Sequence, residues 1–583
     1  MPKNIPNYNL KTKKYPFNSN TPSLIENDGF YLDWPVVYVL NNNKNIYIGE
    51  TYHSADRMRQ HLKSDEKKVL DTCELFASDR FTKSATLDIE SSLIELCSSD
   101  SLAKNKILNK SNGITRHNYA DKQYFSQESY IFNSIWNYLK NRKIVSDDIL
   151  QIKNTDLFKY TPYKSLNAEQ CTYRDYIIKT ITDYYLNDEV KHKNIFVNGS
   201  SGTGKTILAI YLLKLLVSDS KDFELDFDIE DSELSGYIKD LLSLKEKKKK
   251  LEVAYVVSMV PFRGTLKEVF KNIKGLKSNM VIAPAEVSKK KYDVLIVDEA
   301  HRLKQPKSLG ADVGSFYNTN LKLGFVKDKG TQLEWILKQS DISILFYDSN
   351  QTVKPCDIDY SEFNKLVSNS DQYNLTSQMR CLGSNDYIKY IHSMLDGKCN
   401  KYMDFSDNYD FKLFISIDDF CNRLLDKENI DGLCRIVSGY GFEWINKKQK
   451  VNKKRSILKK VSTDISIENR KFYWNLRLSK WPISLEGNDI VDEVGCIHTI
   501  QGYDLNYCGV IFGPEIIYRN NHIEIDKDKY YDINGKQGVN DLKLKEYIIN
   551  IYYVLLSRGI KGTYVYVCDD QLREYLSKFI TTV

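Results

Sequence analysis

The feature that most constrains this chain is a glycine-rich loop between an apolar strand and an apolar helix. Lys193–Asn198 has the composition of a short buried strand, and the apolar run Ile207–Val217 predicts a helix. Between them the chain reads G-x-x-x-x-G-K-T, a pattern whose backbone N–H groups surround phosphate oxygens. The positive end of the following helix adds to the attraction for an anion. The predicted nucleotide-binding residues are Gly199, Ser200, Ser201, Gly202, Thr203, Gly204, Lys205 and Thr206.

Four side chains in and after this loop have specific expected roles. Lys205 is expected to reach the outer phosphates, and the hydroxyl of Thr206 to hold Mg²⁺. The apolar run Asp293–Val297 predicts a buried strand that ends in Asp298 and Glu299. Because successive side chains on a strand point to opposite faces, Asp298 is assigned to the metal and Glu299 to the attacking water. The sequence therefore predicts an ATPase with α/β architecture and a parallel sheet.

Five polar residues farther apart indicate a motor rather than a simple ATPase. Gln170 precedes the loop and could bond the adenine edge, and Gln351 follows a predicted strand, where an amide can sense the γ-phosphate. Arg380 is a candidate phosphate-facing cation. Gln501 lies in the segment IHTIQGYD. Arg558 follows an apolar run and is a candidate arginine finger, a cation that acts when two domains close on a nucleotide.

The order and wording of these segments resemble superfamily 1 helicases, and within them the Schlafen-type DNA/RNA helicase domain. The segments VGCIHTIQGYDLNYCGVIFG (494–513) and YYVLLSRGIKGTYVYVCD (552–569) are the most similar, and the resemblance covers about residues 160–575. It implies two RecA-like P-loop domains with ATP bound between them. Unwinding, translocation alone and an ATP-gated switch stay open as activities. The resemblance places Gln170 at adenine and implies that the coupling residues are Gln351, Arg380, Gln501 and Arg558.

Composition excludes several other classes of protein. The 583 residues are 42% hydrophobic and 27% charged, which is typical of a chain of several globular domains. No apolar run reaches the ~18 residues of a membrane span, so we expect a soluble, cytoplasmic protein without a membrane partner. The 11 cysteines include no C-x-x-C pair, which argues against a zinc ribbon and a disulfide framework.

The predicted domain order follows from these patterns. Two charged stretches, at 222–250 and Lys447–Lys460, are expected to be solvated. The predicted segments are an N-terminal arm (1–30), a small α/β domain (31–120), a helical connector (121–160), a RecA-like ATPase domain with the charged insertion (161–370) and a second RecA-like domain (371–583).

The small N-terminal unit has a pattern of its own. Val36–Leu40 and Ile46–Gly49 predict a hairpin, and a helix after it carries Arg57 and His61 as R-x-x-x-H on one face. Glu90 lies in a further predicted helix. This ordered set resembles the GIY-YIG nuclease domain over about residues 33–120, with VVY in place of the first triplet and YIG retained in the second.

The resemblance implies a metal-dependent endonuclease site. Phosphodiester cleavage needs a metal ion, an activated water and positive charge at the phosphate. Glu90 would hold one divalent ion, and Tyr38 or Tyr47 would activate water once that ion or a neighbour lowers its pKa. Arg57 would neutralise the scissile phosphate, and His61 would assist proton transfer. The residue bracing the site would be Asn109, with Asn112 as the alternative.

Together these patterns predict an ATP-dependent motor on nucleic acid, fused to an endonuclease. Degradation of foreign nucleic acid in anti-phage defence is the expected biology, by analogy of domains. The alternatives are an ATP-driven switch, or a DNA-repair motor whose N-terminal domain binds without cleaving. The expected cofactors are ATP and Mg²⁺, with Mn²⁺ as an alternative at the nuclease site. DNA is favoured over RNA as the partner, and an oligomer or accessory protein stays open.

Overall fold

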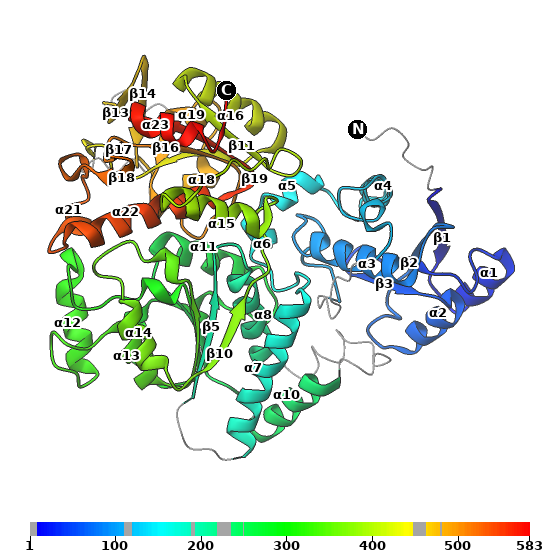
Figure 1. Ribbon diagram of the computed structural model, residues 1–583. Coiled ribbons are helices and arrows are strands. Elements are labelled where there is room, and N and C mark those ends of the chain that lie inside the picture. Colours follow the sequence, from blue (N-terminus) through cyan, green and yellow to red (C-terminus); the bar gives the residue numbers. More distant parts are fainter. Residues whose placement is uncertain are drawn as a thin grey trace. The chain divides into compact units, whose positions relative to one another are not determined.

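The computed structural model of this protein describes residues 9–109, 119–187, 193–218, 235–248, 250–446, 462–477 and 481–583. The chain forms two compact units, which are described separately (Figure 1). The first unit comprises Met1–Glu189, Ile210–Lys250 and Val269–Leu276, and the second comprises Val190–Ala209, Leu251–Glu268 and Lys277–Val583.

The first unit contains a four-stranded antiparallel sheet with the order β1-β4-β2-β3, in which β2 and β3 form the predicted hairpin. Side chains alternate along β2 between two cores. Val37 and Val39 pack with α3, whereas Tyr38 and Leu40 pack with α2. The elements are β1 (Lys11–Pro16), α1 (Thr21–Asp28), β2 (Val36–Asn41), β3 (Ile46–Thr51), α2 (Ser54–Lys63), β4 (Thr72–Ala77) and α3 (Lys83–Cys97).

The prediction of a polar arm over residues 1–30 is wrong for residues 11–28. Strand β1 pairs with β4 along its whole length, and α1 follows it. Tyr15, Phe17 and Ile25 are buried in the core that also contains Tyr38. The pattern was missed because β1 is an edge strand, on which five of six side chains are exposed, so it lacks apolar alternation.

The segment 121–160 is helical, as predicted, but it belongs to the core of the small domain. Phe132 and Trp136 of α4 are buried in the same cluster as Val37 of the sheet. A boundary near residue 120 therefore does not separate two cores. The helices of this region are α4 (Tyr130–Asn141), α5 (Ile149–Lys153), α6 (Asp156–Lys159) and α7 (Ala168–Leu186).

The described part of the first charged stretch is folded, although we expected a solvated insertion. Helix α10 (Ser235–Lys247) packs against α7 and buries Leu241 and Leu244. These leucines, three positions apart, lie on one face of a helix that also carries five charged residues. The rest of this stretch, except residues 248 and 250, lies outside the described residues, as does Lys447–Lys460.

The second unit begins with a six-stranded parallel sheet of order β10-β5-β9-β8-β6-β7. Strand β9 therefore lies between the strand that leads into the glycine-rich loop and the strand that ends in the acidic pair. The strands are β5 (Lys193–Gly199), β6 (Val253–Val257), β7 (Val281–Ile282), β8 (Tyr292–Asp298), β9 (Ser340–Tyr347) and β10 (Asp371–Leu375). The helices are α8 (Lys205–Val217), α11 (Val260–Lys271), α12 (Val313–Lys322), α13 (Gln332–Gln339) and α14 (Tyr360–Val367).

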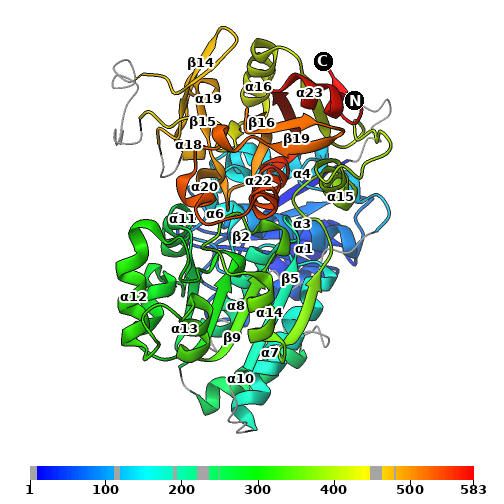
Figure 2. The ribbon, with the colours of Figure 1, turned by 60° about the vertical axis from the view of Figure 1, so that its left-hand side comes forward.

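An eight-stranded sheet of order β13-β14-β15-β12-β16-β19-β11-β20 forms the rest of this unit, and all its pairs except β13–β14 are parallel. Helices α16 and α22 lie on opposite sides of β16 (Figure 2). The strands are β11 (Asp410–Phe414), β12 (Cys434–Ser438), β13 (Ile465–Ile467), β14 (Arg470–Trp474), β15 (Glu493–Gly495), β16 (Leu505–Phe512), β19 (Gly559–Val567) and β20 (Thr581–Thr582). A separate hairpin joins β17 (Ile516–Arg519) to β18 (His522–Ile525), and the longer helices are α15 (Ser384–Leu395), α16 (Ile417–Asp431), α22 (Asp541–Leu556) and α23 (Asp570–Ser577).

The predicted α/β architecture with parallel sheets is confirmed. Within the described ranges, no helix has the length and apolar character needed to cross a membrane.

Glu515, just after β16, makes stability depend on pH. Tyr552 donates a hydrogen bond to its Oε1 (2.6 Å), and burial raises its pKa from 4.5 to about 7. The folded chain therefore holds an extra proton between these values, and stability falls as the pH rises from 4.5 through 7. Ionised Glu515 costs roughly 3 kcal/mol above that range.

Glu515→Gln is neutral at every pH and keeps the acceptor for Tyr552. We expect it to unfold at a higher temperature than the wild type at pH 8, and at the same temperature at pH 4. Calorimetry at both pH values measures the difference, with the exposed Glu574→Gln as the control. Equal melting temperatures of wild type and Glu515→Gln at pH 8 would contradict the assignment.

Candidate functional site

The glycine-rich loop closes around the ammonium group of Lys205, the first residue of α8. Lys205 Nζ donates to the backbone oxygens of Gly199 (2.6 Å) and Ser200 (2.9 Å) and lies 3.6 Å from Asp348 Oδ2. Gly202 has a φ of 84°, a left-handed backbone that favours glycine. A Cβ there would also lie 2.0 Å from Gln378 Oε1, so the loop has no room for a side chain at this position.

Thr206 and Asp298 meet although β5, the strand before the loop, and β8, the strand that ends in Asp298, are not neighbours. Thr206 Oγ1 donates to Asp298 Oδ2 (2.8 Å), and the hydroxyl of Tyr255 donates to the same oxygen (2.7 Å). Burial, and then the charge of Glu299, raise the pKa of Asp298 to about 6. A hydroxyl beside a carboxylate at the end of a strand is a donor set that suits Mg²⁺.

Glu299 follows β8 with an unusual backbone and a specific neighbour. Its φ is 52°, a region that few residues other than glycine adopt and that is enriched at functional sites. Glu299 Oε2 lies 3.2 Å from His301 Nε2. Burial lowers the pKa of His301 well below its usual value, and its Nδ1 accepts the backbone N–H of Asp348 (3.3 Å). The neutral ring therefore carries its proton on Nε2, facing Glu299.

The segment after β10 lies over the loop and brings Arg380 to it. Arg380 Nη1 donates to Ser201 Oγ (2.7 Å), and Arg380 Nε lies 2.5 Å from Asp504 Oδ1. Gln378 Nε2 donates to the backbone oxygen of Ser201 (2.8 Å), and Ser557 Oγ donates to Ser201 Oγ (3.2 Å). Sequence reasoning missed Gln378, Asp504 and Ser557, although each lies next to or near a predicted residue.

Gln351 and Arg558 meet across the two sheets of the second unit. Gln351 follows β9 and donates from Nε2 to Asp348 Oδ2 (2.6 Å), while its Oε1 accepts from Arg558 Nη2 (3.3 Å). Arg558 precedes β19 and is 1% exposed, so a full charge is buried at this junction. Burying a guanidinium is costly unless an anion or several acceptors face it.

Gln501 is a further buried polar residue of the second unit. It is 1% exposed, and within the described residues neither atom of its amide has a hydrogen-bond partner. A buried amide without partners is rare in a folded protein. The cations Lys205 and Arg380 at the loop, together with the hydroxyl of Thr206 and the carboxylate of Asp298, fit a polyanionic ligand with a divalent metal ion.

A direct hydrogen bond joins α11 to the turn that follows Gln501. Thr265 Oγ1 of α11 and the hydroxyl of Tyr503 lie 2.5 Å apart, and both residues are buried. The neighbouring Gly502 has a φ of 89°, and a Cβ there would lie 2.7 Å from the ring of Phe262. The turn that holds Gln501 is therefore packed against α11.

Gln170 belongs to the first unit and is fully buried. Its Oε1 accepts the backbone N–H of Asn167 (3.1 Å), and its own N–H donates to Asn167 Oδ1 (2.8 Å). This reciprocal pair is a capping box that begins α7. The assignment of Gln170 to adenine stays a prediction.

In the small domain, Tyr38, His61 and Arg57 come together. The hydroxyl of Tyr38 lies 2.6 Å from His61 Nε2, and Arg57 Nε donates to the same hydroxyl (3.4 Å). Burial lowers the pKa of His61 to about 2, with smaller effects of Lys67 and Arg57. Burial also raises the pKa of Tyr38, which exceeds the opposite effect of Arg57. Tyr38 is therefore the donor and neutral His61 the acceptor.

The expected lowering of a tyrosine pKa by a neighbour does not occur. Tyr38 and Tyr47 are both buried, and desolvation disfavours a phenolate at either position. In this arrangement His61, rather than a phenolate, is the base already present beside the tyrosines.

Two further residues hold this cluster. A Cβ at Gly49 would lie 2.3 Å from the Tyr38 hydroxyl, so only glycine leaves room for that side chain. The amide of Asn109 continues the sheet beyond β3: its Oδ1 accepts from the backbone N–H of Ile48 (3.0 Å), and its Nδ2 donates to the oxygen of Ile48. Asn109 thus supports the strand that carries Tyr47, and Asn112 lies outside the described residues.

Glu90 lies on α3, half-buried, and its negative charge raises the pKa of both Tyr38 and Tyr47. Glu50 has the same effect on Tyr38 and accepts a hydrogen bond from Thr86 (3.0 Å). In the described parts of the chain, no group of three or more His, Cys, Asp or Glu side chains is placed to share a metal ion. A divalent ion at Glu90 stays a prediction.

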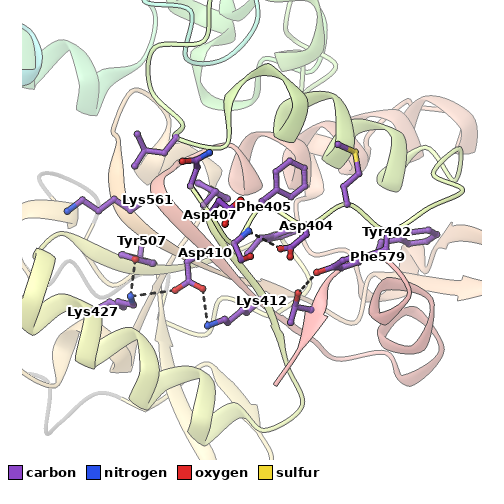
Figure 3. Close-up of a pocket in the computed structure, with 17 residues that line it drawn as sticks. Tyr402, Asp404, Phe405, Asp407, Asp410, Lys412, Lys427, Tyr507, Lys561 and Phe579 are labelled. Carbon is purple, nitrogen blue, oxygen red and sulfur yellow. Dashed lines mark hydrogen bonds and ion pairs between the residues drawn. The ribbon is translucent and has the colours of Figure 1, made fainter. Parts of the chain in front are cut away.

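A cavity of about 490 Å³ lies elsewhere, near the starts of β11, β16 and β19 (Figure 3). None of the residues predicted for either site lines it. Three of its charged groups are paired with one another: Asp410 lies 3.1 Å from Lys412 and 3.5 Å from Lys427, and Lys427 donates to the hydroxyl of Tyr507 (3.0 Å). These groups are already satisfied, so we assign no ligand to this cavity.

Comparisons with known proteins agree with the geometry of the second unit. Residues 192–569 match the family described as Schlafen group 3, DNA/RNA helicase domain. The chain is 27% identical over 457 residues to the uncharacterized protein YPL245W of Saccharomyces cerevisiae, covering 71% of this chain and 90% of that protein.

Two solved helicase structures are also similar. The Pif1 helicase from Candida albicans is 12% identical, with 70% of this chain and 96% of that chain covered and a TM-score of 0.27. The Pif1 helicase in a structure of DNA unwinding at forked dsDNA is 11% identical, with 66% and 91% covered and a TM-score of 0.24. These TM-scores are too low to establish a common fold.

Proposed function

We propose that this chain, which belongs to the Schlafen group 3 DNA/RNA helicase domain family, couples ATP hydrolysis to movement on nucleic acid. The observation that supports the proposal is that two segments after the six-stranded sheet contact Ser201 of the loop. Arg380, between β10 and α15, and Ser557, between α22 and β19, both contact this one side chain. A nucleotide bound between two RecA-like domains would contact both of them. Its hydrolysis would remove some of these contacts and could therefore change how the two domains pack.

Each residue of this site has a part in the proposed reaction. Lys205 would neutralise the outer phosphates, and Thr206 and Asp298 would hold Mg²⁺, which supplies positive charge at those phosphates. Glu299, oriented by His301, would polarise the attacking water. Arg380 and Arg558 would stabilise the developing charge, and Gln351 and Gln501 would sense the γ-phosphate and relay its loss.

The hydrogen bond between Thr265 and Tyr503 should couple the nucleotide site to α11. Tyr503→Phe removes it without changing the ring that packs there. A neutral hydrogen bond contributes ~0.5–1.5 kcal/mol, so stimulation of the ATPase by nucleic acid should fall ~2–10-fold. ATPase rates with and without single-stranded DNA measure this change, and basal turnover should be unaltered. Undiminished stimulation in Tyr503→Phe would assign the coupling to other contacts.

For the small domain we propose a GIY-YIG-type endonuclease. Support comes from Tyr38 bonded to neutral His61, with Arg57 at the same hydroxyl. The Tyr38 hydroxyl lies 2.6 Å from His61 Nε2, so a proton could pass from Tyr38, or from water through Tyr38, to His61 once a bound phosphate stabilises the imidazolium that burial disfavours. Mg²⁺ or Mn²⁺ at Glu90 would add positive charge at the phosphate.

The second candidate is a small domain that binds nucleic acid without cleaving it. The observation that favours it is the raised pKa of both tyrosines, which leaves neither as a ready base. Biologically, foreign nucleic acid in anti-phage defence or damaged DNA in repair would suit the same two domains. The relative in Saccharomyces cerevisiae gives no support to a role confined to phage defence.

Incubation of the purified protein with labelled DNA and RNA tests the nuclease, with and without ATP, Mg²⁺ and Mn²⁺. We expect metal-dependent cleavage that falls at least ~10²-fold in Glu90→Ala, because a metal site is an electrostatic group of the transition state. Glu95→Ala, a buried glutamate on the same helix, is the matched control. Both variants should keep ATPase activity. Wild-type protein that cleaves no substrate under any of these conditions would leave the binding-only candidate.

A further inference from the structure

Lys67 lies in the turn after α2, and its ammonium group is placed over the ring of Tyr47. Lys67 Nζ is 4.1 Å from the centroid of that ring. Its backbone N–H bonds to the oxygen of Ser64, which holds the turn in place. Among the described residues the ammonium has no ion pair, whereas the adjacent Lys68 pairs with Asp65 at 2.5 Å. Lys67 is thus a half-buried cation whose observed contact is an aromatic face.

The ring under Lys67 is part of the predicted nuclease cluster. The Tyr47 ring lies 5.0 Å from the ring of His61 and 6.2 Å from that of Tyr38. Arg57 reaches the hydroxyl of Tyr38. The positive charges of Lys67 and Arg57 both lower the pKa of His61, so both lie near it.

Two cations facing one small cluster repel each other and lose hydration. In agreement, burial and then Arg57 lower the pKa of Lys67 to about 8. Glu90 and Glu50 add negative charge at Tyr38, but within the described residues no carboxylate pairs with Lys67, so an anion bound at Lys67 would offset its loss of hydration. The anion that the neighbouring groups suit is a phosphodiester, because a tyrosine hydroxyl, a neutral imidazole and an arginine surround the same point.

We propose that Lys67 binds the scissile phosphate of a nucleic-acid substrate, acting with Arg57 as the second cation of the site. The proposal rests on the proposed nuclease function. Lys67 makes and breaks no bond in this role. It holds the negative charge that grows on the phosphate oxygens as water attacks, and it does so from the side of Tyr47. No sequence pattern indicates this role, since Lys67 lies outside the R-x-x-x-H motif.

Cleavage by three variants of the full chain tests the contribution to the reaction. Lys67→Met removes the charge but keeps the length of the side chain, and should lower kcat/KM ~10²-fold, as loss of one such electrostatic group does. Lys67→Arg should recover most of the activity. Lys68→Met, the matched control on the adjacent surface lysine, should cleave like the wild type. ATPase activity should be unchanged in all three. A Lys67→Met protein that cleaves at the wild-type rate overturns the proposal.

A second measurement uses only the wild-type protein, so it does not depend on how a variant folds. Lysines are labelled with an amine-reactive acetylating reagent and quantified by mass spectrometry, with and without a thymidine dinucleotide that contains one phosphodiester. The dinucleotide should protect Lys67 and not Lys68. The same dinucleotide with an uncharged methylphosphonate linkage should protect neither.

The two measurements separate the failure of this inference from that of the nuclease. Protection of Lys67 in a protein that never cleaves supports the phosphate contact and rejects the nuclease. Equal labelling of Lys67 with and without the phosphodiester overturns the contact, even if the wild type cleaves.

Discussion

ATP hydrolysis in Glu299→Gln is expected to be ~10²–10⁴-fold slower than in the wild type, with ATP binding retained. Glutamine has the same shape but cannot accept a proton from water. The structure places the Glu299 carboxylate 3.2 Å from His301 Nε2, on a residue with a left-handed backbone. Thr206 and Asp298, the proposed Mg²⁺ ligands, are left intact, so the nucleotide should still bind.

Steady-state phosphate release and binding of a fluorescent ATP analogue separate these two effects. Lys205→Ala is the informative comparison, because it removes the cation at the phosphates and should weaken nucleotide binding itself. Full ATPase activity in Glu299→Gln would reject Glu299 as the base. A loss of binding equal to that in Lys205→Ala would make Glu299 a structural residue.

Arg558→Ala is expected to keep nucleotide binding and to lose turnover by ~10³-fold or more, the effect of removing an arginine finger. Arg558 comes from the eight-stranded part and reaches Gln351 at the end of β9 in the six-stranded part. Because it is buried across that junction, its charge can act on a nucleotide only when both parts are in place.

The measurement is single-turnover hydrolysis at saturating ATP. Arg558→Lys retains the charge but not the planar fork, so it should recover only part of the rate. If Arg558→Ala lost binding and kept normal turnover at saturation, Arg558 would have to be reassigned to holding the ground state.

The local structure of the candidate nucleotide site could be predicted largely from the sequence, because its chemistry needs particular residues at fixed local spacing. The loop from Gly199 to Thr206 has to follow a strand and begin a helix, and it does. Asp298 and Glu299 likewise had to end a strand. The insertion of β9 between β5 and β8 could not be predicted, since strand order depends on crossover connections rather than on local pattern.

In the small domain, less of the structure could be predicted from the sequence. The hairpin of β2 and β3 followed from two runs of β-forming residues on either side of a polar turn. Strand β1 could not be predicted, because an edge strand with one buried residue carries almost no apolar pattern. The shared core of Val37 and Trp136 was missed for another reason: burial of residues about a hundred positions apart is not visible in a local window.

By itself the sequence determined the strand, loop and helix that form the candidate nucleotide site. Local requirements can be recognised from residues that are neighbours in the sequence. Examples are a glycine where a side chain would clash and a charged residue at the end of a strand. Only the tertiary structure decided which distant groups meet. It brought Arg380 and Ser557 to Ser201, Thr265 to Tyr503, and Lys67 to the ring of Tyr47. The physical reason is that burial sets these partnerships and their pKa values, and burial is a property of the folded chain as a whole.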